Sequence, residues 1–272
     1  MTRRTRSASS KPAVRRVISS LEGADGALEF RLLDSAHTVS NDLPVFVLIH
    51  GIGMSHRYLE SLHDRLAERA RVISIDLPGF GGLPKPSWNP DVAAMARGIA
   101  DALRQYDLQR VVLVGHSMGA QWAVEAAAQH PDFVHSVVAM GPVADAAHRT
   151  VGAQARALAL DTLREKPGTN LIVFGDYFRA GISWYLAQLR HMLAYGIEDR
   201  VAVLRVPLLV IRGEADPVAG AEWCEYLCDT APDGEMKSFD GSHVVQRFSP
   251  EAVAEGVLQH AVRFVGPPER ER

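Results

Sequence analysis

The sequence predicts an α/β protein in which a mostly parallel central sheet is flanked by helices and carries a helical insertion. Short apolar, β-branched runs alternate with amphipathic stretches along the 272 residues. Several of these runs are almost unbroken, which is typical of strands buried on both faces of a parallel sheet. With 47% hydrophobic residues, the chain can bury one large core. We therefore expect one large α/β domain rather than two equal ones.

The individual elements follow from these patterns. The predicted strands are LEFRLL (28–33), VFVLIH (45–50), RVISID (71–76), RVVLVG (110–115), VHSVVAM (134–140), PLLVIRG (207–213) and EMKSFDG (235–241). The predicted helices cover 57–70, 91–106 and 249–264. Asp91 lies in the first turn of the second helix, and Ser249 with Pro250 is a start signal for the third. Alternating strands and helices indicate a parallel sheet, whose ligands bind outside the carboxyl ends of the strands.

Two segments depart from the alternation. Residues 1–24 are basic and Ser-rich, and we expect them to form a disordered tail. Residues 143–200 read as helical apart from the short run NLIVFG (170–175). We expect them to form a helical cap over the strand ends, inserted between core segments 25–142 and 201–272.

Composition excludes several classes of function. A net charge of −3 gives no reason to expect nucleic-acid binding, and no apolar run is long enough for a membrane span. Arg15 and Arg16 interrupt the stretch where a signal peptide would be apolar. Cys224 and Cys228 lie one helical turn apart with no further ligand at metal spacing, so we expect no metal site. With no signal peptide or disulfide framework expected, the predicted location is the cytoplasm.

The stretch VVLVGHSMG (111–119) places Ser117 where a buried strand turns directly into a helix. Gly115 and Gly119 remove side chains that would collide in so tight a turn. The turn exposes the Ser117 hydroxyl at a helix N-terminus, where the Met118 amide can stabilise an oxyanion. This is the G-x-S-x-G nucleophile elbow, and it predicts that Ser117 is a nucleophile.

A serine nucleophile needs a base, and the base needs an orienting acid. His243 is the predicted base because it lies in a loop between the last strand and the last helix. We interpret His116, beside the nucleophile, as a packing residue, and His50 as a brace for its loop. The predicted acid is Asp216, in the polar turn after the run 207–213. The competing acids are Glu214, in the same turn, and Asp145, after the run 134–140.

These motifs together resemble the α/β-hydrolase fold superfamily, in particular capped serine hydrolases of the carboxylesterase and lipase type related to C–C bond hydrolases. The motifs are LIHGIG (48–53), DLPGFG (76–81), GHSMG (115–119), RGEADPV (212–218) and GSH (241–243). The resemblance implies a second oxyanion donor, the amide of Ile52 in the turn between Gly51 and Gly53. Asp76 is expected to brace the neighbouring loop.

The predicted reaction is hydrolysis of a carboxylic ester with an apolar or aromatic part, through an acyl-enzyme and without a cofactor. The predicted substrate-binding residues are Gly51, Gly53, Tyr177 and Trp184. One alternative uses the same triad to cleave a C–C bond beside a ketone, or a thioester. Another is a receptor-like protein that binds a ligand with little turnover. The expected partner is a small apolar ester, and a homodimer is the oligomer considered.

Overall fold

The computed structural model describes residues 13–19, 26–35, 43–108, 110–145, 176 and 181–263. Its core is an eight-stranded sheet with the order β1-β2-β4-β3-β5-β6-β7-β8. The strands are β1 (Ala13–Ser19), β2 (Leu28–Asp34), β3 (Val45–Ile49), β4 (Val72–Asp76), β5 (Val111–His116), β6 (Val134–Met140), β7 (Leu208–Gly213) and β8 (Gly234–Phe239). The six strands from β3 to β8 pair in parallel, and β1 and β2 pair antiparallel. This confirms the predicted fold class.

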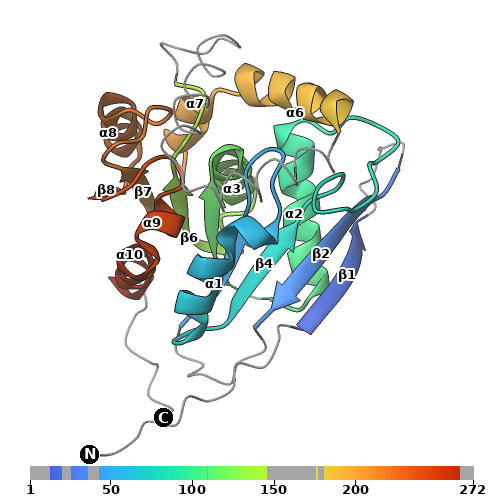
Figure 1. Ribbon diagram of the computed structural model, residues 1–272, viewed down its shortest axis with the longest axis horizontal. Helices are drawn as coiled ribbons and strands as arrows, with labels where there is room; N and C mark the ends of the chain where they lie inside the picture. The colour runs from blue at the N-terminus through green and yellow to red at the C-terminus, as the bar shows by residue number, and fades with distance from the viewer. Residues whose placement is uncertain are drawn as a thin grey trace, which may run out of the picture.

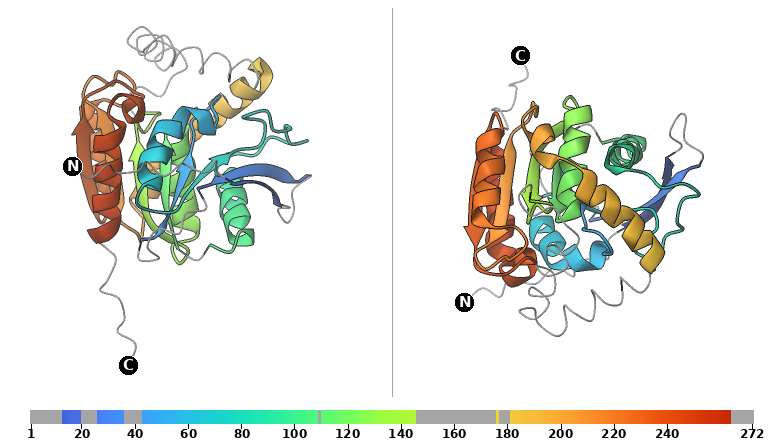
Figure 2. Two further views of the ribbon diagram at one scale, coloured as in Figure 1. Left: turned by 60° about the horizontal axis from the view of Figure 1, so that its bottom comes forward. Right: turned by 90° about the horizontal axis from the view of Figure 1, so that it is seen from above.

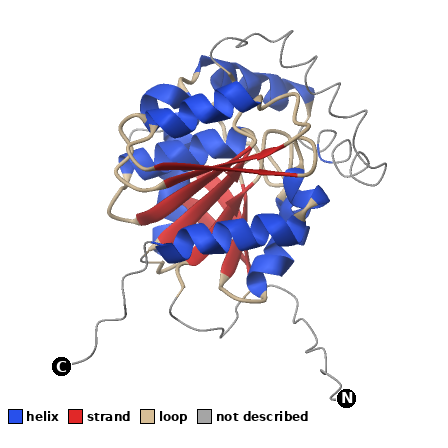
Figure 3. Cartoon of the chain, turned by 90° about the vertical axis from the view of Figure 1, so that its left-hand side faces the viewer, coloured by secondary structure: helices blue, strands red, loops and turns tan. Residues whose placement is uncertain are grey.

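Helices cover both faces of the sheet (Figures 1 and 3). They are η1 (His56–Leu59), α1 (Glu60–Ala67), α2 (Val92–Gln105), α3 (Met118–Gln129), α6 (Ile182–Ala194), α7 (Ile197–Val201), α8 (Ala221–Thr230), α9 (Val245–Phe248) and α10 (Pro250–Arg263). One hydrophobic cluster packs α2, α3 and α8 on one face, and a second packs α1, α9 and α10 on the other. Alternate residues of β5 divide between the clusters, as expected for a strand covered on both sides: Val111 and Leu113 join the first, Val112 and Val114 the second.

All seven predicted strands are present, but the tail prediction is wrong for residues 13–19, which form β1. This strand pairs with β2 along its whole length, from Ala13 opposite Asp34 to Ser19 opposite Leu28. Most of its side chains are exposed, so its sequence lacks the apolar face that signals a strand. The long-range pairing with β2 makes it one.

The predicted helix starts are mostly confirmed. Asp91 is the N-cap of α2, and its carboxylate accepts a hydrogen bond of 2.8 Å from the Ala94 amide. Pro250 begins α10 as expected. The Ser249 hydroxyl, however, donates to the carbonyl of Asp240 at 2.8 Å rather than capping α10.

Within the predicted cap, the structure describes residues 143–145, 176 and 181–200, which include α6 and most of α7, and residues 146–175 and 177–180 lie outside the described residues. Helix α6 lies above the strands in Figure 1, and Figure 2 shows it from two further sides. The Gln188 amide donates to the Asn89 side chain and to the Pro90 carbonyl, in the segment between β4 and α2. Gln121 of α3 donates to the carbonyl of Met192. These contacts hold α6 at the carboxyl end of the sheet.

Candidate active site

Ser117 sits at the bend between β5 and α3. Its backbone has φ 58° and ψ −123°, a left-handed conformation that is strained for a residue with a side chain. A Cβ atom on Gly115 would lie 2.1 Å from the carbonyl oxygen of Gly119, and one on Gly119 would lie 2.4 Å from that of Ile49. Both glycines are therefore required by close backbone approach, as their spacing around Ser117 predicts.

His243 and Asp216 meet in the loops after β8 and β7. His243 Nδ1 lies 3.0 Å from Asp216 Oδ2, and both side chains are buried. Asp216 Oδ1 accepts two further hydrogen bonds, from the amides of Val218 (2.7 Å) and Ala219 (3.0 Å). Burial by itself would raise the pKa of the Asp216 carboxyl, but the interaction with His243 and these amides lower it overall. Asp216 is therefore an ionised acceptor, so His243 donates from Nδ1, and Nε2 is the ring nitrogen left to act as a base.

The end of β6 borders all three of these residues. The Ser117 amide donates to the carbonyl of Met140 at 2.9 Å. The next residue, Gly141, has φ 52°, and a Cβ atom on it would lie 3.0 Å from His243 Nδ1 and 3.4 Å from Asp216 Oδ2. The fold thus gathers residues 117, 216 and 243 around one strand end. Glu214, the local competitor for the acid, is exposed.

His116 contributes more than the packing that its position suggests. Its Nε2 lies 2.9 Å from the backbone oxygen of His243 and, because a carbonyl only accepts, Nε2–H is the donor. The His116 and His243 ring centroids are 4.8 Å apart. Burial, reinforced by the charge of His243, lowers the pKa of His116 to about 3, so this ring is neutral. The sequence could not reveal the contact, because the two residues are 127 positions apart.

The loop after β3 lies against Ser117. A Cβ atom on Gly51 would lie 3.0 Å from Ser117 Cβ and 3.5 Å from its Oγ. His50 Nε2 accepts a hydrogen bond from the Leu77 amide at 3.2 Å, so Nδ1 carries the proton and donates to the Gly51 carbonyl at 2.8 Å. Because the peptide unit is trans, holding this carbonyl turns the Ile52 amide to the opposite side. His50 thus braces the loop, as expected, and burial lowers its pKa.

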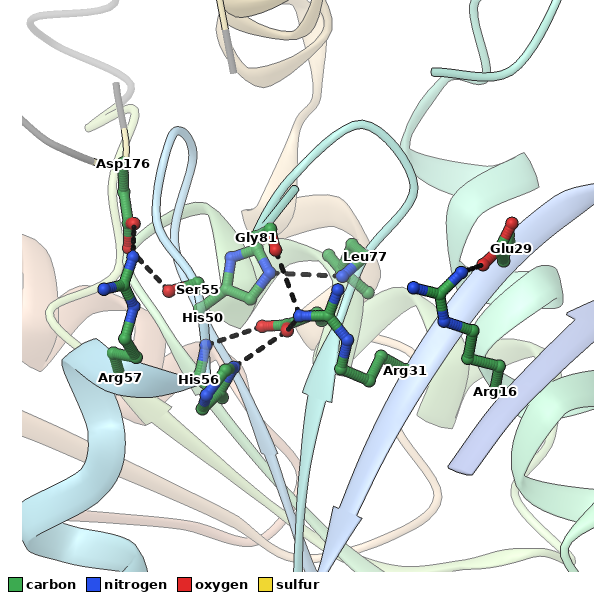
Figure 4. A network of polar contacts seen from close by, with 11 residues as sticks. Arg16, Glu29, Arg31, His50, Ser55, His56, Arg57, Leu77, Gly81 and Asp176 are labelled. Atoms are coloured by element: carbon green, nitrogen blue, oxygen red, sulfur yellow. Dashed lines mark hydrogen bonds and ion pairs between the residues drawn. The ribbon is translucent and has the colours of Figure 1, made fainter. Parts of the chain in front are cut away.

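Asp76, at the end of β4, holds His56, which follows the same loop. Its carboxylate accepts hydrogen bonds from Arg31 at 2.8 Å and from the backbone and ring of His56 at 2.7 and 2.8 Å. Arg31 and His56 are labelled in Figure 4. Burial would raise the pKa of the Asp76 carboxyl, but the hydrogen bond and charge of His56 and the charge of His50 lower it overall. These contacts match the bracing role expected of Asp76.

The comparisons with known proteins agree with this architecture. A family profile described as "alpha/beta hydrolase fold" matches residues 44–156. The structure of a thermophilic esterase from Thermogutta terrifontis superposes with a TM-score of 0.76 at 22% identity, covering 93% of this chain and 100% of the esterase. The chain therefore has the α/β-hydrolase fold, and its segment 44–156 matches the profile of that family.

Curated relatives are similar to this chain over part of their length. A 2-(acetamidomethylene)succinate hydrolase from Mesorhizobium japonicum is 38% identical over 97 residues, which are 36% of this chain and 35% of that protein. An sn-1-specific diacylglycerol lipase, ABHD11, from Mus musculus is 34% identical over 145 residues, which are 51% of this chain and 45% of the lipase. The matched stretch therefore spans less than half of either relative.

The structure describes part of the cap side of the candidate site. Trp184 of α6 is buried against Phe80, with ring centroids 6.1 Å apart, and against Gly79. Tyr177 lies outside the described residues. Gly53 has φ 77°, which a glycine adopts without strain. The substrate-binding roles of these residues stay predictions.

Asp176 connects the cap segment to the loop after β3. Its carboxylate accepts a hydrogen bond of 2.5 Å from the Ser55 hydroxyl and one of 2.9 Å from Arg57 (Figure 4). The Asp176 side chain is fully buried, so the Arg57 ion pair compensates its charge. Sequence reasoning missed this contact because Ser55 and Asp176 are 121 positions apart.

Two other kinds of site are absent from the described part of the chain. Within them, no cluster of three or more His, Cys, Asp or Glu side chains is arranged to hold a metal ion. None of their helices combines the length and hydropathy needed to cross a bilayer.

Proposed function

We propose that this protein is a serine hydrolase that cleaves a carboxylic ester with an apolar or aromatic part through a covalent acyl-enzyme. The observation that carries the proposal is the buried His243–Asp216 pair, 3.0 Å apart, at the strand end that also binds the Ser117 amide. A serine hydroxyl becomes nucleophilic when an adjacent imidazole can take its proton and a carboxylate stabilises the imidazolium that results.

In the proposed acylation, Ser117 Oγ attacks the ester carbonyl while its proton passes to His243 Nε2. Asp216 holds the imidazole in the productive tautomer and stabilises its positive charge. The amides of Ile52 and Met118 donate to the oxyanion of the tetrahedral intermediate. When that intermediate collapses, His243 protonates the leaving alcohol, and Ser117 keeps the acyl group.

In the proposed deacylation, a water molecule gives a proton to His243 Nε2 and attacks the acyl carbonyl. The second intermediate collapses to the free acid, and the proton returns from His243 to Ser117 Oγ. The cycle consumes one water and needs no redox partner or cofactor. Both cysteines are free thiols, which supports the proposed location in a reducing cytoplasm.

Two measurements test the proposal. We expect a fluorophosphonate probe to label the native protein and to leave the Ser117→Ala variant unlabelled. A series of p-nitrophenyl esters of increasing acyl length, with Ser117→Ala as the blank, should show turnover that depends on chain length. Labelling without ester turnover, but with cleavage of a diketone or a thioester, would replace the ester assignment by that alternative. Tight ligand binding without labelling would favour a receptor-like protein.

A further inference from the structure

The His243 loop is held from two sides, each by a neighbour of another triad residue. On the acid side, the Ala215 amide, next to Asp216, donates to the Gly241 carbonyl at 3.0 Å. On the nucleophile side, the ring of His116, next to Ser117, donates to the His243 carbonyl at 2.9 Å. The first contact places the loop relative to the acid. The second places it relative to the nucleophile.

The His116 ring is itself firmly held. It contacts the rings of both Tyr58 and His243, with centroid separations of 5.3 and 4.8 Å, and it is 2% exposed. His116 is the last residue of β5, which pairs with β3 and β6 on its two sides. Because strand β5 holds His116 in the centre of the sheet, the His116 ring cannot move with the His243 loop. The hydrogen bond from this ring therefore restrains the loop.

The tautomer of His116 is defined by the same contact. Nε2 carries the proton, and Nδ1 is buried with no hydrogen-bond partner among the described residues. Protonating Nδ1 would bury an uncompensated charge beside His243, which itself becomes positive during the proposed reaction. A neutral ring therefore gives His243 a hydrogen-bond donor without placing a second positive charge against the imidazolium.

We propose that His116 is a positioning residue that sets the separation between the Ser117 hydroxyl and the His243 ring, through the hydrogen bond from its Nε2–H to the His243 carbonyl. This inference rests on the proposed function, because it assigns His116 a role in the proton transfer from Ser117. It goes beyond that function because His116 is not a member of the triad. His116 belongs to the elbow motif, and the inference gives it the role of positioning the base, His243.

A matched pair of substitutions separates the hydrogen bond from packing. In glutamine, Nε2 lies as many bonds from Cα as Nε2 does in histidine, so His116→Gln can keep the donor. Methionine has a similar length and volume without a donor, so His116→Met removes the hydrogen bond. The readouts are kcat and KM on a short p-nitrophenyl ester, the rate of fluorophosphonate labelling, and Tm.

We expect His116→Met to lower both kcat and the labelling rate by about tenfold, the upper end for one neutral hydrogen bond. KM should change less than about twofold, because the contact positions the base rather than the substrate. His116→Gln should recover both rates to within about threefold of native, and its Tm should fall less than that of His116→Met, because the His243 carbonyl keeps a donor. A native rate in His116→Met, or equal losses in the two variants, would overturn the inference.

A measurement on the native protein covers the case in which His116→Met does not fold. Long-range ¹H–¹⁵N spectra of the histidines should show His116 as the Nε2–H tautomer, unchanged between about pH 6 and pH 9. An Nδ1–H tautomer would remove the donor and refute the inference. If the native protein is not labelled by the fluorophosphonate at all, the proposed function fails. If it is labelled but the Gln and Met variants do not differ, only this inference fails.

Discussion

Replacing Asp216 by asparagine tests the proton chemistry with almost no change of volume. Asp216 Oδ1 accepts the amides of Val218 and Ala219, so an asparagine must keep its oxygen there and turn its NH₂ group toward His243. That group donates, so His243 Nδ1 must become an acceptor and its proton must move to Nε2. A protonated Nε2 cannot take the proton of Ser117.

The magnitude follows from the geometry. At the 3.0 Å separation of the pair, a carboxylate and an imidazolium attract by roughly 5.5 kcal/mol at an effective dielectric constant of about 20, or about 10⁴ in rate. The same exchange in serine proteases lowers kcat by about 10⁴ through the wrong tautomer. The wrong tautomer and the lost attraction are two descriptions of the same defect, so the two factors of about 10⁴ are not multiplied. We expect kcat to fall by about 10⁴ in total.

The assay is p-nitrophenyl ester hydrolysis at neutral pH, with active sites counted by fluorophosphonate labelling. Glu214→Gln is the matched control, because Glu214 is an exposed carboxylate two residues away. It should change kcat less than about twofold. A loss below tenfold in Asp216→Asn, or an equal loss in Glu214→Gln, would refute the reasoning.

Three further predictions concern stability. Asp76→Asn should cost about 3–5 kcal/mol in urea unfolding at pH 7. Because the folded-state pKa of Asp76 is lowered, its contribution to the free energy of unfolding is fully present above its unfolded pKa and is lost as the pH falls through its folded pKa. The difference in stability between Asp76→Asn and the native protein should therefore shrink in acid. A difference that stays constant with pH would contradict this. Gly115→Ala should cost roughly 3 kcal/mol or more, because its Cβ meets backbone at 2.1 Å, whereas Gly220→Ala, with open space, should stay within about 1 kcal/mol; equal losses would argue against the clash. Tyr195→Phe should cost about 1.5–3 kcal/mol in thermal unfolding, because it removes a 2.7 Å hydrogen bond to the buried Glu125 carboxylate, and an unchanged Tm would refute this.

The central strands could be predicted because each one carries its own signal. Residues 110–115 form an apolar run that is buried wherever the sheet lies, and Gly115 with Gly119 marks the tight turn that follows. The edge strand β1 could not be predicted the same way. Its side chains are mostly exposed, and it becomes a strand only by pairing with β2.

The candidate site, too, could be predicted only in part from the sequence. Spacing predicted Ser117 at a bend and Asp216 ahead of its competitors, and the structure brings Asp216 to His243 while Glu214 stays exposed. No feature of the sequence indicated the hydrogen bond from the His116 ring to the His243 carbonyl. Nor did any feature indicate the contact between Asp176 and the Ser55 hydroxyl.

The sequence by itself determined the fold class, the turn at Ser117 and the short set of side chains from which a triad could be drawn. The periodic pattern of buried residues and the glycines of a tight turn each depend on only a few neighbouring residues. A short stretch of sequence is therefore enough to reveal them. Only the tertiary structure decided which ionisable groups meet and which protons they hold, because hydrogen-bond partners and desolvation depend on segments more than 100 residues away, as at His116.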